Sequence, residues 1–306
     1  MRRLPALVVA AGFLATLTAC APDLGFPEDC ETAPAGAAAS TVEATGEVGE
    51  MPTVTFPSPL IAGSIESAEL VRGDGVQIDD GDPVLVQATI LNGGDGSVLE
   101  QTPYDGGGSL FTVGLDAVPE LSAALECASV GSRIVAVAPP ADDAADQTAG
   151  ASVVYVVDVL DRFASRADGV DQLPQNGMPS VVTAPDGTPG ITVPSESAPA
   201  DFREAVLKLG DGEEVAADST VVAKYTAVDW DERTVTTSTW TTGTAEALQL
   251  GGTEISVGLA EAIEGKKVGS QILAVIPPSL AGSASTPAES TATLVYVVDI
   301  LGIVAP

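Results

Sequence analysis

The chain has 306 residues, of which 43 are acidic and 12 are basic, giving a formal net charge of −31 at pH 7. A charge this negative repels the phosphates of nucleic acids and anionic lipid headgroups, so we expect no nucleic-acid partner. Histidine is absent, which excludes histidine-based catalytic triads, histidine zinc sites and the commonest general base. The length allows about two domains.

The first nineteen residues have the pattern of a secretion signal. Arg2 and Arg3 supply positive charge, and the uncharged run of residues 4–17 is too short for a permanent membrane helix, which needs about 20 apolar residues. The ending Leu17-Thr-Ala-Cys20 resembles the lipobox of bacterial lipoproteins. This resemblance implies a diacylglyceryl group on the Cys20 thiol and cleavage just before it. The alternative is an ordinary secretory signal in which the cysteine falls by chance.

Residues 20–50 are predicted to form a lipid-anchored flexible tether, because they are rich in Ala, Pro, Thr, Gly and Glu and lack hydrophobic periodicity. Besides Cys20 the chain contains Cys30 and Cys127. An oxidising compartment favours a disulfide between these two, although two separate buried thiols would also fit the sequence. A disulfide would tie the tether to the first domain.

Residues 51–163 form the first predicted domain. Pro119 stands where a helix would begin, and Leu121 and Leu125 form the apolar stripe of that helix. The polar residues 164–177, which include Gly and Pro, are typical of a linker.

Residues 178–306 form the second predicted domain. Three segments rich in Val, Ile, Thr and Tyr predict strands, namely 219–227, 271–276 and 293–301. Leu259 and Ile263 lie four residues apart and Gly265 follows as a stop, which predicts one short helix. Several antiparallel strands with one helix in each half predict an α+β fold.

The two halves repeat each other in the same order. Four segments of the first half correspond in sequence to four segments of the second. The pairs are Met51-Pro-Thr-Val-Thr with Met178-Pro-Ser-Val-Val, Arg72-Gly-Asp-Gly with Leu209-Gly-Asp-Gly, the Val-Gly-Ser segment at Val130 with that at Val268, and residues 153–160 with residues 294–301. This order indicates a duplicated domain rather than a short solenoid unit. The Gly-Asp-Gly segments lack the spacing of a calcium loop and predict solvated turns, so no metal or other cofactor is implied.

The second half resembles FKBP-type peptidyl-prolyl isomerases. The resemblance is carried by Tyr225-Thr226, residues 228–240, Leu250-Gly251, Ile255-Ser-Val-Gly-Leu259, Gly265-Lys-Lys-Val-Gly-Ser270, Val275-Ile-Pro-Pro278 and 293–301. It implies a twisted antiparallel half-barrel sheet over one short helix, with the prolyl pocket between them. The first half carries the same frame with more losses. Tandem domains of this kind on a lipobox-bearing chain resemble exported actinobacterial isomerases.

Carried onto this sequence, the family's pocket includes five residues that match it well. Tyr225, Leu248 and Tyr296 match residues of the pocket wall. Ile255 and Ser256 match the loop in which a backbone N–H, here that of Ser256, meets the substrate carbonyl.

Three further pocket positions depart from the family. Val235 stands where the family has phenylalanine, Thr236 where it has aspartate, and Leu259 where it has tryptophan at the floor. The tyrosine expected after the Pro-Pro turn is also missing from residues 280–283. The pocket is therefore expected to lose ring area and polar partners.

In the first half the resemblance places Ala88 at the wall tyrosine, Pro119 at the position of the Ser256 N–H, and Ser122 at the floor. Phe111 and Tyr155 remain as walls. We therefore expect the first domain not to isomerise prolyl bonds.

The resemblance implies an exported peptidyl-prolyl cis-trans isomerase that acts on proline-containing polypeptide clients at the outer face of the membrane. The reaction needs no nucleophile, metal or proton relay, so a chain without histidine can perform it. One alternative is a catalytically silent FKBP-like lipoprotein that binds peptides or a partner, and another is a purely structural lipoprotein. Trp230 and Trp240 flank a loop, where they either pack its apolar edge or form a lip for a peptide.

Overall fold

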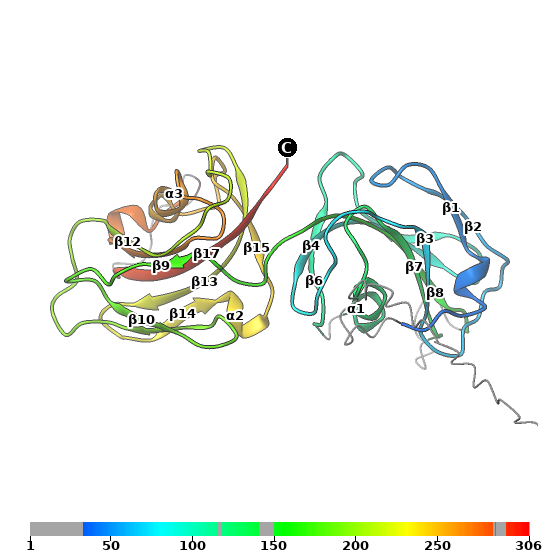
Figure 1. The fold of residues 1–306 in the computed structure, drawn as a ribbon, viewed down its shortest axis with the longest axis horizontal. Helices are drawn as coiled ribbons and strands as arrows, with labels where there is room; N and C mark the ends of the chain where they lie inside the picture. The colour runs from blue at the N-terminus through cyan, green and yellow to red at the C-terminus, as the bar shows by residue number, and fades with distance from the viewer. Residues whose placement is uncertain (1–32, 116–117, 141–149, 284, 286–291, 306) are drawn as a thin grey trace, which may run out of the picture. The chain divides into compact units, whose positions relative to one another are not determined.

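A computed structural model describes residues 33–115, 118–140, 150–283, 285 and 292–305 (Figure 1). The first of its two large sheets is antiparallel and has the strand order β3-β7-β8-β4-β5, with β6 also paired to β4. Its strands are β3 (Glu66–Val71), β4 (Pro83–Asn92), β5 (Val98–Gln101), β6 (Ser109–Thr112), β7 (Arg133–Ala138) and β8 (Val153–Arg162).

The second large sheet repeats this order. It runs β14-β13-β17-β16-β12-β9, with β15 also paired to β13, so β12, β16, β17, β13, β14 and β15 take the places of β3, β7, β8, β4, β5 and β6. Its strands are β9 (Val170–Asp171), β12 (Arg203–Leu209), β13 (Thr220–Asp229), β14 (Val235–Ser238), β15 (Glu246–Gln249), β16 (Gln271–Ile276) and β17 (Leu294–Val304). The shared topology accompanies the repeat of the sequence.

One short helix packs on one face of each sheet, which we call the helix face. Helix α1 (Pro119–Leu125) buries Leu121 and Leu125, and helix α3 (Val257–Ile263) buries Leu259 and Ile263. Both helices lie where the four-residue spacing of leucine and isoleucine predicts them. A further α-helical turn, α2 (Thr239–Thr242), and a 3-10 turn, η2 (Pro278–Leu280), lie in loops. Antiparallel sheets with few helices confirm the α+β fold class.

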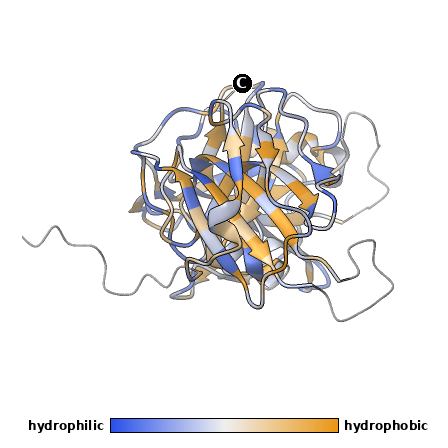
Figure 2. Cartoon of the chain, turned by 90° about the vertical axis from the view of Figure 1, so that its right-hand side faces the viewer, coloured by the Kyte–Doolittle hydropathy of each residue, from blue (hydrophilic) through white to orange (hydrophobic). Residues whose placement is uncertain are grey.

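The opposite, outer face of each sheet is also covered. In the first domain the cover is the 3-10 turn η1 (Ala39–Thr41) with the hairpin of β1 (Glu43–Thr45) and β2 (Thr53–Thr55). In the second it is the hairpin of β10 (Ser180–Thr183) and β11 (Pro189–Thr192). Every residue of β7 and β16 is consequently buried. Figure 2 shows hydrophobic segments on many strands, interrupted by hydrophilic ones. Burial on two faces explains apolar runs without alternation.

The layer that covers the outer face of the first domain includes part of the predicted tether, so the prediction of a flexible segment is wrong for that part. Residues 33–50 belong to the folded unit, because Ala38, Ala39 and Val42 pack into the outer-face core. Small residues gave this segment a flexible composition, yet they suit close packing against a sheet. The remainder of the predicted tether, together with the predicted signal, lies outside the described residues.

The predicted linker of residues 164–177 is likewise held on the second domain. The Ala167 N–H donates to the buried Asp299 carboxylate (2.8 Å), and the Lys208 ammonium donates to the Ala167 carbonyl (3.0 Å). Strand β9 then pairs with the end of β12. The Ala167 backbone N–H therefore satisfies a buried carboxylate, whereas residues 170–177 are exposed.

The repeated Gly-Asp-Gly and Val-Gly-Ser segments touch each other. The Gly73 N–H donates to the Ser132 hydroxyl (2.9 Å), and the Gly210 N–H donates to that of Ser270 (3.0 Å). A Cβ on Gly210 would stand 2.1 Å from the Val268 carbonyl oxygen, so only glycine permits this approach. The close contact between the Gly-Asp-Gly and Val-Gly-Ser segments is thus a structural reason for their recurrence in both halves of the sequence. Within the described residues, no helix has the length and hydropathy needed to cross a membrane.

Candidate functional site

A cavity of about 590 Å³ opens on the helix face of the second sheet. Its walls come from β13, β15, β17, the loop after β15 and the first turn of α3. The lining residues are Tyr225, Glu246, Ala247, Leu248, Gln249, Gly252, Thr253, Glu254, Ile255, Ser256, Leu259 and Tyr296. Six of the eight sequence-predicted pocket residues are among them, and they come from segments far apart in the chain.

Two tyrosines form the aromatic part of the wall. Tyr225 on β13 and Tyr296 on β17 have ring centroids 6.0 Å apart, with the ring planes tilted by 46°. This geometry lies in the range of favourable aromatic pairs. Burial raises the pKa of both hydroxyls, and the Glu246 carboxylate, which accepts a 2.7 Å hydrogen bond from Tyr225, raises that of Tyr225 further. Both side chains therefore stay neutral at physiological pH.

The first turn of α3 presents the backbone group that the resemblance singles out. The Ser256 hydroxyl accepts from the Leu259 N–H (3.3 Å) and caps the helix, while the Val257 N–H donates to the Gly282 carbonyl (2.9 Å). Successive N–H groups of an extended segment point to opposite sides. Because Ser256 is extended (φ −66°, ψ 144°), its N–H points away from the Gly282 loop.

Apolar side chains complete the cavity. Leu248, Ile255 and Leu259 all pack against the helix-face core of the second domain, and Leu259 is buried. These apolar side chains can hold a proline ring. They therefore contribute binding and desolvation.

Val235 and Thr236 do not line the cavity. Both lie exposed on β14, where Val235 pairs with Val228, three residues beyond Tyr225 along β13. At about 3.3 Å per residue this separates them from the tyrosine by about 10 Å along the strand. The Thr236 hydroxyl instead donates to the Ala227 carbonyl (3.2 Å).

Sequence reasoning missed Glu246, although a signal for it existed. Along β15, Glu246 pairs with Ala223 and Leu248 pairs with Val221, so both side chains share the face of these core residues. A strand with one buried face should carry apolar residues at both positions. The acidic residue at an inward position is thus the anomaly that marks the site. Glu254, on the loop before α3, was also missed.

The first domain has a different set of side chains at the corresponding positions. The register of the paired strands in the two sheets places Ala88 at the position of Tyr225, Phe111 at that of Leu248 and Tyr155 at that of Tyr296. Ser109 stands where the second domain has Glu246. The tyrosine–carboxylate pair is therefore specific to the second domain.

The expected register of α1 was wrong by one residue. Both α1 and α3 end five residues before the Val-Gly-Ser segment. Aligned on that segment, Val118 takes the place of Ser256 and Leu121 that of Leu259, whereas Pro119 and Ser122 each fall one residue later. The first domain thus keeps an apolar floor, and Pro119 replaces Val257.

The two tryptophans pack inside the second domain. Trp230 is buried and donates from Nε1 to the Glu196 carbonyl (3.0 Å). The Lys224 ammonium lies 5.0 Å from the centroid of the Trp240 ring, within the range of a cation–π contact. Neither tryptophan lines the cavity, so packing explains them better than a peptide lip.

Cys127 is disulfide-bonded. Cys20 and Cys30, the only other cysteines of the chain, lie outside the described residues, so the pairing with Cys30 stays a prediction. The reach of the chain permits this pairing, because the Ala33 N–H donates to the Ala123 carbonyl of α1 (2.7 Å). Ala33 follows Cys30 by three residues, a reach of about 10 Å, and Cys127 closely follows Ala123.

Comparisons with known proteins find similarity in the segment that contains this cavity. Residues 211–301 match the family model of FKBP-type peptidyl-prolyl cis-trans isomerase. An FK506-binding protein of Streptomyces anulatus is 29% identical over 122 residues, covering 38% of this chain and 96% of that protein. The segment of residues 211–301 is therefore similar to FKBP-type domains.

Two solved structures are also similar. FkpA from Escherichia coli is 28% identical, with coverage of 40% of this chain and 51% of FkpA and a TM-score of 0.30. The three FKBP domains of wheat FKBP73 are 19% identical, with coverage of 79% of this chain and 95% of that structure and a TM-score of 0.33.

Proposed function

We propose that the second domain is a peptidyl-prolyl cis-trans isomerase that acts on proline-containing polypeptides. The observation that carries this proposal is the open cavity between Tyr225, Tyr296, Ser256 and Leu259, which the chain's own side chains leave unfilled. Its position within the segment that matches the isomerase family model supports the same function.

The cavity suits the physics of this reaction. Rotation about a prolyl bond passes through a twisted amide, with a barrier of about 20 kcal/mol. Twisting removes the amide resonance and makes the carbonyl less polar, so an apolar pocket favours the twisted state over the planar one. In the proposed complex, Tyr225, Tyr296 and Leu259 enclose the proline ring and the Ser256 N–H donates to the substrate carbonyl.

The proposed site of action is the outer face of the membrane. In this proposal residues 1–19 direct export and a lipid on Cys20 anchors the mature chain. The disulfide at Cys127 supports export, because disulfides persist in oxidising compartments. The charge of −31 makes attraction to anionic headgroups unfavourable, so the lipid itself would hold the protein at the membrane.

Proline-limited refolding of a model substrate tests the activity. The full chain should accelerate the slow phase, and Tyr296→Ala should lower kcat/KM about tenfold, since an aromatic wall contributes about 1 kcal/mol or more. The matched control is Tyr155→Ala at the same position of the first domain, which should keep full activity. Circular dichroism would verify that both variants fold.

A catalytically silent peptide-binding module is the second candidate. The observation that favours it is the loss of ring area, with Leu259 at the floor and Val235 outside the cavity. It predicts binding of proline-containing peptides without any acceleration of refolding. Well-folded protein that neither accelerates refolding nor binds such peptides would contradict both candidates.

A further inference from the structure

The cavity of the second domain carries charge where its fold calls for apolar side chains. Glu246 lies on β15 directly opposite the buried Ala223 of β13, and its side chain is on the helix face. Glu254 joins it in the lining, with Oε1 accepting from the hydroxyls of Ser285 (3.0 Å) and Thr253 (3.3 Å). The lining contains these two carboxylates and neither lysine nor arginine.

Glu246 is held in place by a group that does not neutralise it. The Tyr225 hydroxyl donates to Oε2 (2.7 Å), which orients the carboxylate beside the aromatic wall. An ionised carboxylate can accept about four hydrogen bonds, and among the ion pairs of the described residues none involves Glu246 or Glu254. The carboxylate therefore keeps both its charge and its capacity to accept from a cationic donor.

We propose that this cavity selects prolines flanked by lysine or arginine, and that Glu246 is the residue that recognises the cation. The selection rests on the proposed isomerase function and defines its substrate class. A lysine ammonium or arginine guanidinium next to the proline would donate to Glu246 while Tyr225 and Tyr296 enclose the ring. Clients with an acidic residue at that place would meet two like charges and bind poorly.

The first domain supplies an internal comparison. At the same strand positions it has Ala88 and Ser109 in place of Tyr225 and Glu246. The pair of Tyr225 and Glu246 thus belongs to the domain with the preserved walls. A general surplus of acidic residues would not by itself place one at an inward position beside that wall.

The test compares short peptides that contain Lys-Pro, Leu-Pro or Glu-Pro, and a second set with the charge after proline. Exchange NMR gives kcat/KM for the full chain, and titration of the same peptides gives Kd without any need for turnover. We expect kcat/KM to rise about fivefold from Leu-Pro to Lys-Pro and to fall again for Glu-Pro. The preference should weaken at high salt, because Glu246 is exposed.

Three variants decide whether Glu246 is responsible. Glu246→Gln keeps an acceptor for the Tyr225 hydroxyl but should remove the preference for Lys-Pro, and Glu246→Lys should reverse it towards Glu-Pro. Glu264→Gln removes the same charge from an exposed position of the same domain outside the cavity. It should preserve the preference.

The possible outcomes distinguish a failure of the proposed selectivity from a failure of the proposed isomerase activity. Preferential binding of Lys-Pro peptides without turnover would refute the isomerase but support the selection. Turnover with equal kcat/KM for all peptides, or a preference that Glu246→Gln leaves intact, would overturn the selection and keep the isomerase. Absence of both binding and turnover would refute both.

Discussion

A buried aspartate occupies the middle of each sheet, and its neighbours differ between the two domains. In the first domain Asp158 lies between Gln87 and Arg133 on adjacent strands, and the Arg133 guanidinium makes two 2.6 Å hydrogen bonds to it. In the second domain Asp299 lies between Lys224 and Gln271. The cation and the amide have therefore exchanged strands around the same carboxylate.

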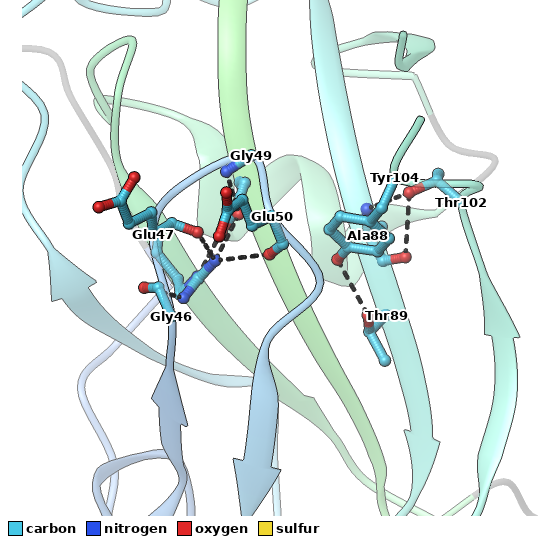
Figure 3. A network of polar contacts seen from close by, with 10 residues as sticks. Gly46, Glu47, Gly49, Glu50, Ala88, Thr89, Thr102 and Tyr104 are labelled. Atoms are coloured by element: carbon cyan, nitrogen blue, oxygen red, sulfur yellow. Dashed lines mark hydrogen bonds and ion pairs between the residues drawn. The ribbon is translucent and has the colours of Figure 1, made fainter. Parts of the chain in front are cut away.

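The aspartate also fastens the segment that precedes each sheet. Asp158 accepts from the Gly49 N–H (2.6 Å), and Arg133 donates to the carbonyls of Gly46, Glu47 and Glu50, which surround its guanidinium (Figure 3). In the second domain the Ala167 N–H takes the part of the Gly49 N–H. Neither contact could be foreseen from the sequence, because each joins residues more than 100 positions apart.

Arg133→Gln should lower the free energy of unfolding by about 3–5 kcal/mol, because it leaves the buried Asp158 without its cation. Adding Gln87→Lys, which copies the arrangement of the second domain, should recover part of this loss. Chemical denaturation of the single and double variants measures both effects. Arg72→Gln is the control, since Arg72 is exposed and such a pair contributes at most about 1 kcal/mol. If the single and double variants lost the same free energy of unfolding, Gln87→Lys would not compensate for the absence of Arg133. That result would contradict the proposal that the cation can occupy either neighbouring strand.

Asp299 should make the stability of the second domain depend on pH. Burial raises the pKa of Asp299, and hydrogen bonds from Ala167 and Gln271 and the charges of Lys208 and Lys224 oppose that rise only in part. Because the pKa of Asp299 is higher in the folded than in the unfolded state, protonation of Asp299 stabilises the fold. This stabilisation is fully present below the unfolded pKa of about 3.9 and is lost as pH rises through the folded pKa. Asp299→Asn removes the titrating group and should not lose stability in this way. The free energy of unfolding of the variant, relative to that of the wild type, should therefore increase as pH rises from the unfolded to the folded pKa of Asp299. Denaturation midpoints at several pH values test this, and a constant difference would argue against it.

At the scale of elements, local patterns predicted the helices and central strands well. Leu259, Ile263 and Gly265 place α3 where it lies, and Gly265 adopts the left-handed φ of +72° that ends a helix. The outer-face layers could not be predicted, because residues 33–50 bury alanines whose composition equally suits a flexible segment. Six of the eight residues named from the resemblance line the cavity, whereas Val235 and Thr236 lie outside it. Their positions depend on a strand register that the sequence does not display.

Gly258→Ala probes the contact between α3 and the strand below it. A Cβ at this position would stand 2.5 Å from Cγ2 of Ile276 and 3.2 Å from the backbone oxygen of Leu280. Overpacking of this kind costs about 1–3 kcal/mol, and a shift of α3 would also move the Ser256 N–H. We expect a lower denaturation midpoint together with a higher KM. The control is Ala260→Gly on the same helix, which should lower stability by about 1 kcal/mol or less without such a shift. An unchanged KM in Gly258→Ala would show that the helix tolerates the methyl group in place.

At the scale of the whole molecule, the predicted disulfide between Cys30 and Cys127 would connect the proposed membrane anchor with the first folded domain. Mass spectrometry of intact, non-reduced protein from membranes should show a diacylglyceryl mass on Cys20 and a peptide cross-link between Cys30 and Cys127. Reduction and alkylation should then label two thiols. A free Cys30 with Cys127 joined to Cys20 would contradict both the pairing and the lipid attachment.

The exchange of the buried cation between strands constrains how the two domains diverged. Removing the Arg133 cation from the buried Asp158 costs about 3–5 kcal/mol, a large part of a typical total stability of about 5–15 kcal/mol. A second cation can be gained first without that loss. A path between the two arrangements that avoids this loss therefore passes through a domain with lysine on one strand beside the aspartate and arginine on the other.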